Sequence, residues 1–138
     1  MGQQQLLLII LGVIIVGIAI AVGLSLFSAQ SVESNRDALI NDLNNLNANA
    51  YQFYIRPTSM GGGGGAFDMS KGAAAIYSIP AKMASNDNGT YVATPGPTTI
   101  KFVGTSGAGN GTVTCTFDAA TGKITAAGFT FTGTFQGS

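Results

Sequence analysis

The chain has almost none of the side chains on which most enzymes and metalloproteins depend. Its 138 residues include no histidine, no tryptophan and one cysteine. Without histidine the chain has no His-based metal site, no haem-attachment motif and no nucleophile activated by an imidazole. A single cysteine also excludes a disulfide within the chain. These absences argue against an enzyme, and we expect neither a cofactor nor a bound metal.

Charged residues are also scarce. They make up 9% of the chain, whereas about a quarter is usual in globular domains. Six basic residues balance six acidic ones, so the composition provides no basic patch for a phosphate backbone, and we predict no binding to nucleic acid. The twenty glycines, together with many threonines, alanines and asparagines, favour an exported surface protein of low charge.

The chain does have one long apolar run, residues 6–27, which contains no charged residue. As a helix it would measure roughly 33 Å, enough to cross the hydrocarbon of a bilayer. No proline interrupts it, so we predict a continuous helix. Gly17 with Ala21, and Ala19 with Gly23, have the four-residue spacing that lets helix backbones approach closely. The alternative is that these small residues are merely scattered along a lone membrane anchor.

The helical pattern continues past this run but becomes amphipathic. Asp42, Asn47 and Asn49 fall among its polar positions, and Pro57 predicts its end because the residue before a proline avoids the helical region. We predict a helical rod over residues 1–57 whose apolar stripe covers a following sheet. The stripe has steps of seven, four, three, four and three residues: Val32, Leu39, Leu43, Leu46, Ala50 and Phe53.

A glycine-rich linker, residues 58–66, separates the rod from a head formed by residues 67–138. Its five consecutive glycines are not followed by the Gly-Lys-Ser/Thr of a phosphate-binding loop. We interpret the linker as a tight return of the backbone over the end of the rod. Flexibility, or close approach to another subunit, would suit the same composition.

The head has the two-residue period of β-strands. We predict an α+β fold, in which the long N-terminal helix packs against a small C-terminal antiparallel sheet of about four strands. A shift in apolar parity predicts a bulge near Ala127 and Gly128. Residues 73–79 could be a short helix or another strand. The expected strands are residues 91–94, 99–104, 112–117 and 123–126, with Phe129 and Phe131 following the bulge in the shifted parity.

Three residues of the head could carry chemistry. Cys115 shares a strand face with Val113 and Phe117, so we predict a buried structural thiol. Asn88 and Asn110 each begin an Asn-Gly-Thr triplet, which is an acceptor sequence for N-glycosylation. Asn-Gly is also a tight hairpin turn, which explains both triplets without sugar.

In this organisation the chain resembles type IV pilins, which also have an apolar N-terminal helix, its amphipathic continuation, a linker and a small antiparallel sheet. The resemblance implies a subunit held in the inner membrane and polymerised with its own copies by a pilus assembly machinery into an extracellular filament. It implies N-methylation of Met1, if Met1 is the first mature residue. Gln5 stands where most pilins have a glutamate, so docking by a charge pair is not expected. The helices forming the filament core would pack through Leu6, Leu7, Ile10, Val13, Ile14, Gly17, Ala21, Leu24 and Phe27.

Two alternatives share these features. A minor pilin, or a pseudopilin of a secretion system, would have the same rod but would cap or start a short fibre. A single-pass membrane-anchored binding domain would use Tyr77, Tyr91 and a threonine-rich face to contact a surface or a glycan. The amphipathic half of the rod argues against this last function, because a simple anchor does not need it.

Overall fold

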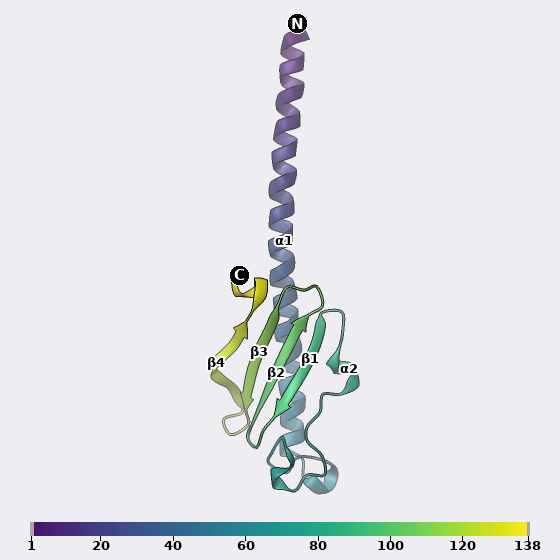
Figure 1. The fold of residues 1–138 in the computed structure, drawn as a ribbon, viewed down its shortest axis with the longest axis vertical. Helices are drawn as coiled ribbons and strands as arrows, with labels where there is room; N and C mark the ends of the chain where they lie inside the picture. The colour runs from purple at the N-terminus through teal and green to yellow at the C-terminus, as the bar shows by residue number, and fades with distance from the viewer. Residues whose placement is uncertain (1, 138) are drawn as a thin grey trace.

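A single helix dominates the computed structural model, which describes residues 2–137. Helix α1 spans Gly2–Ile55, a length of 54 residues, and ends immediately before Arg56 and Pro57. The predicted continuous helix is therefore confirmed. Its upper half stands clear of the other elements, and its lower half runs along the sheet (Figure 1).

The head is built around a four-stranded antiparallel sheet in which each strand pairs with the next along the chain. This confirms the α+β class and the predicted sheet. The predicted bulge is also confirmed, because Cys115 pairs with Phe129 while Phe117 pairs with Ile124, and Gly128 between them has a φ of 64°. The strands are β1 (Gly89–Pro95), β2 (Thr99–Ser106), β3 (Thr112–Asp118) and β4 (Lys123–Phe131).

The core lies between α1 and the inner face of the sheet. The middle of the predicted stripe, from Leu39 to Ala50, is at most 1% exposed, and Val32 and Phe53 at its ends are partly buried. Cys115 is also 1% exposed, which confirms the buried thiol. Each large apolar side chain buried in this way contributes about 1.5–3 kcal/mol. The sheet contributes Ile100, Phe102, Val113, Cys115 and Phe117 to this core.

Residues 73–79 form neither the helix nor the strand that their sequence suggested. They run as an extended connection in which the backbone N–H of Tyr77 donates to the carbonyl of Phe67 at 2.8 Å. The Tyr77 ring packs edge-on against Phe53 and Phe102, at centroid distances of 5.5 and 6.2 Å. One buried aromatic ring thus fixes this segment, and regular structure resumes only after Pro80, with α2 (Ala81–Ala84).

The glycine run closes the lower end of α1. After the short turn η1 (Thr58–Met60), the backbone N–H groups of residues 63, 64 and 65 donate at 2.8–2.9 Å to carbonyls of the last helical turn and of the residue that follows it. These carbonyls have no partner within the helix and must find one elsewhere. The backbone therefore makes a tight return over the end of the rod. The acceptors are Phe53, Arg56 and Tyr54.

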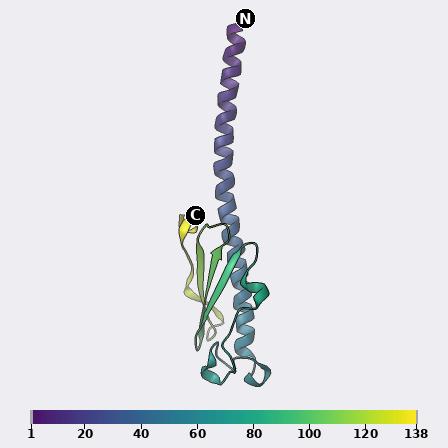
Figure 2. The ribbon, with the colours of Figure 1, turned by 45° about the vertical axis from the view of Figure 1, so that its right-hand side comes forward.

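Two further short turns complete the head, η2 (Met69–Lys71) and η3 (Gly133–Gly137). Phe135 of η3 is 1% exposed and adds to the core, and η3 lies beside α1. The sheet and its connections thus cover one side of the lower half of α1 (Figure 2).

Candidate functional site

The main candidate site is the bare upper half of α1. All of its residues from position 2 to position 31 are exposed. Within residues 6–27 the large apolar side chains are 51–72% exposed. The segment is long and apolar enough to cross a membrane, and none of it is buried within the molecule. A surface of this kind is compatible with membrane anchoring or with burial against other protein.

The residues predicted to pack a filament core all lie on this bare segment: Leu6, Leu7, Ile10, Val13, Ile14, Gly17, Ala21, Leu24 and Phe27. A Cβ added at Gly17 would meet nothing within 4 Å, so the helix is open at this position. Gln5 is exposed as well. Met1, the predicted methylation site, lies outside the described residues.

A polar cluster on one flank of α1 holds the head in place, and it was not predicted from the sequence. Oδ2 of Asp42 accepts hydrogen bonds from Nδ2 of Asn86 at 2.9 Å, from Nδ2 of Asn88 at 3.0 Å and from the hydroxyl of Tyr91. Burial by itself raises the pKa of Asp42, but the three hydrogen bonds outweigh it and lower that pKa below 3.8. Burial, and then the neighbouring carboxylate, raise the pKa of Tyr91.

Asn35 forms a second polar contact, nearer the bare segment. Its Oδ1 accepts from the Ser106 hydroxyl at 2.5 Å and from Nδ2 of Asn110 at 3.2 Å. Its own Nδ2 donates to the Asn88 carbonyl at 3.3 Å. The sequence does contain a polar residue at position 35 of the helix and two Asn-Gly pairs in the head. No local pattern, however, shows that residues so far apart in the chain will contact each other.

Asn88 and Asn110 therefore both contact α1, through the amide nitrogens that would carry sugar. Their glycosylation stays a prediction. Both triplets lie in turns, as their Asn-Gly pairs indicate, but each connection is longer than a tight hairpin. Asn88 precedes β1, after a turn held by the Asn86 side chain, and Asn110 ends the longer connection between β2 and β3.

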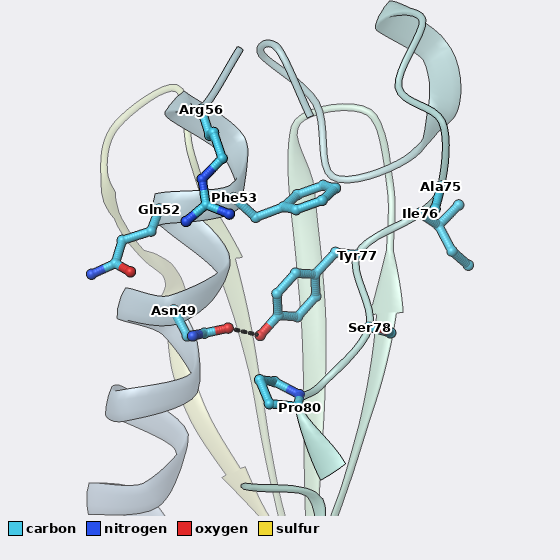
Figure 3. A pocket seen from close by; sticks show the side chains of 9 residues that line it. All are labelled: Asn49, Gln52, Phe53, Arg56, Ala75, Ile76, Tyr77, Ser78 and Pro80. Carbon is cyan, nitrogen blue, oxygen red and sulfur yellow. Dashed lines mark hydrogen bonds between the residues drawn. The ribbon is translucent and has the colours of Figure 1, made fainter. Parts of the chain in front are cut away.

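An open hollow of about 340 Å3 lies between the lower end of α1 and the segment leading to Pro80. Figure 3 shows the hydroxyl of Tyr77 meeting Oδ1 of Asn49, at 2.7 Å, with the Arg56 side chain extending toward this pair. Burial raises the pKa of Tyr77 to about 12, so its hydroxyl is a neutral donor at physiological pH. Gln52, Phe53 and Pro80 also line the hollow.

The structure corrects one detail of the binding-domain alternative. Tyr77 and Tyr91 are each 4% exposed, because both rings point inward between the sheet and α1. Neither ring can contact an external surface or glycan in this fold. Within residues 2–137 no group of three or more acidic or cysteine side chains is placed to hold a metal ion.

In comparisons with known proteins, no protein-family model, no curated protein and no solved structure matches the chain.

Proposed function

We propose that the chain is the structural subunit of an extracellular filament of the type IV pilus kind. In this filament, residues 6–27 of many copies pack together along the axis. One observation carries the proposal: an uncharged helical segment, exposed on every side, continues without a break into the helix half that bears the head.

The energetics of the bare segment favour assembly over dispersal. In a membrane, exchanging lipid for other copies nearly cancels the hydrophobic term, and close packing of small residues such as Gly17 and Ala21 decides the outcome. In water the balance is different. At about 25 cal/mol per Å2, exposing on the order of 1,000 Å2 of apolar surface costs about 25 kcal/mol per subunit. Once outside the membrane, the assembled state is therefore strongly preferred.

The shape of the molecule also suits a polymer. The head covers only the lower half of α1, so it leaves the whole circumference of the upper half open to neighbours (Figures 1 and 2). A domain that needed only an anchor could be joined to it by a loop. Here anchor and head share one continuous helix, and the position of the packed segment therefore determines the position of each head.

The proposal includes a path through the cell. The subunit is held in the inner membrane by residues 6–27 before assembly, and a pilus assembly machinery transfers it to a filament on the cell surface. N-methylation at Met1 belongs to the same proposal. Because Gln5 is neutral, the segment enters the filament without burying an unpaired carboxylate.

Electron microscopy of filaments sheared from the producing cells tests this function, with mass spectrometry to identify the subunit. We expect helical fibres in which this chain is the most abundant protein, and no such fibres after deletion of its gene. A trace amount in fibres made of another subunit would favour a minor pilin or pseudopilin. Recovery of the chain only as single copies in membranes would contradict the proposal and favour an anchored binding domain.

A further inference from the structure

The lower half of α1 has a side that the sheet does not cover, although Asn45 and Gln52 at its edge border hollows beside α2 and the segment leading to Pro80. We call it the back face, defined by Asn41, Asn44, Asn45, Ala48, Gln52 and Ile55. These residues recur at helical spacing opposite Leu43 and Ala50, which lie at the centre of the buried stripe. All six are exposed, and Ile55 is 60% exposed. Figure 2 shows the sheet along one side of this part of the helix.

The back face has an unusual composition for a surface that stays in water. Residues 43–55 contain no charged side chain, and the back face consists of four amides and two apolar residues. Solvated helix faces normally carry lysine, glutamate and arginine, whereas depletion of charge is typical of the centre of protein interfaces. Asparagine is also a poor helix former, so helix propensity does not account for Asn41, Asn44 and Asn45.

No contact within the subunit accounts for these side chains either. Within residues 2–137, no hydrogen bond or ion pair joins the amides of the back face to the head. By contrast, the polar residues on the flanks of the same helix, Asn35, Asp42 and Asn49, each bond to the head. The polar residues that bond to the head therefore lie on one face of α1, and the polar residues that do not bond to it lie on another.

We propose that the back face of α1 is a second interface between copies of this chain. An amide both donates and accepts hydrogen bonds, so a face of amides can pair with an identical face, and a neutral face does not repel its own copy. A charged partner would find no opposite charge on it. This inference rests on the proposed function, since packing the apolar segments brings the lower halves of neighbouring helices side by side.

The rate of thiol labelling tests this interface on intact filaments. Cys115 is 1% exposed and burial raises the pKa of its thiol, so the natural chain gives a low background. Asn45→Cys places a thiol on the back face, and Thr105→Cys places one on the exposed outer face of β2 as the matched control. A maleimide is reacted with filaments and with the same subunits dispersed in detergent.

We expect the thiol of Asn45→Cys to react at least about tenfold more slowly in filaments than in detergent. In filaments the maleimide can reach this thiol only when the interface between copies opens locally. The thiol of Thr105→Cys should react at similar rates in both. Equal rates at position 45 would overturn the inference and leave the proposed function intact. If the natural chain forms no filaments, the proposed function itself fails. A bifunctional cross-linker at position 45 should give dimers of this chain, and products with a different protein would overturn the choice of partner.

A charge variant gives a second, independent measurement. Asn44→Asp with Gln52→Glu adds two carboxylates to the back face with almost no change in side-chain shape. Thr94→Asp with Thr105→Asp adds the same charge to the outer face of the sheet. The first pair should abolish most of the filament yield while the head still melts normally in detergent, because identical carboxylates would be buried between copies. Equal yields from the two pairs would overturn the inference.

Discussion

At the scale of single residues, the head is oriented on α1 by a few polar side chains that border the buried stripe. The carboxylate of Asp42 accepts three hydrogen bonds from the head, and the Asn35 side chain makes three with it. Apolar packing between a helix and a sheet tolerates sliding, whereas these bonds have fixed partners. They therefore determine the position of the sheet along the helix.

Removing the hydroxyl of Tyr91 tests this role. We expect Tyr91→Phe to lower the free energy of unfolding by about 1 kcal/mol at pH 7, because the partly buried carboxylate loses one donor. Tyr51→Phe is the control, since its ring is 37% exposed. The measurement is thermal unfolding of the full chain in detergent, followed by circular dichroism. Equal melting temperatures for the two variants would contradict the assigned role.

The same cluster makes the stability of the head depend on pH. The folded state lowers the pKa of Asp42 below 3.8. Its contribution is therefore complete above the unfolded pKa and is lost as pH falls through the folded value. The stability difference between the natural chain and Asp42→Asn should be constant near neutrality and should shrink below about pH 4. Melting temperatures measured across this range test the prediction, and a difference that grows with acidity would contradict it.

Residues that follow one local rule were predictable, and those chosen by a distant partner were not. Strand alternation placed Cys115 inward correctly. Asn47 was assigned to the polar side of the helix but is 4% exposed, with its Nδ2 3.8 Å from the sulfur of Cys115. The helical period cannot show that the sheet offers a thiol at this position. For the same reason the sequence did not reveal the contact between Asp42 and Tyr91.

At the scale of elements, prolines and glycines in the sequence predicted most of the boundaries of the helix and strands. Pro57 ended α1, turn glycines separated the strands, and the parity shift located the bulge beside Gly128. The prediction of a helix or strand over residues 73–79 was wrong, because the burial of the Tyr77 ring determines the path of this segment. A local hydrophobic period does not. The composition of the glycine run does not show where its backbone goes, and only its hydrogen bonds at the end of the helix reveal the tight return.

The glycine run gives a test at this scale. A Cβ on Gly63 would lie 1.8 Å from the carbonyl oxygen of Ala66, whereas a Cβ on Gly107 would have 3.6 Å to its nearest neighbour. We expect Gly63→Ala to destabilise the head by about 2 kcal/mol or more, because a backbone atom must shift. Gly107→Ala should change stability by less than about 0.5 kcal/mol. Chemical denaturation measures both, and a tolerated Gly63→Ala would indicate a loose linker.

At the scale of the whole molecule, α1 divides into two halves with different surfaces. The upper half is apolar and bare, and the lower half is buried on one side by the head. Mutations in the upper half should therefore affect assembly without affecting the fold of the head. Mutations in the buried stripe should affect both.

Gly17 tests this separation. A side chain at Gly17 meets nothing within the subunit, and Val16 beside it is 57% exposed. We expect Gly17→Leu to reduce the filament yield at least about fivefold, a loss of about 1 kcal/mol of packing per subunit, since helix backbones can no longer approach closely. Val16→Leu adds bulk at the neighbouring position and should assemble nearly normally. Equal yields would show that no close helix contact occurs at Gly17, and the heads of both variants should melt alike.

The most direct test is a helical reconstruction of the filament by electron cryomicroscopy, at a resolution that shows helices and large side chains. We predict residues 6–27 of successive subunits in mutual contact around the axis, with the heads outside and neither lipid nor water between the apolar helices. A map with the heads at the axis and the apolar segments projecting outward would contradict the central claim.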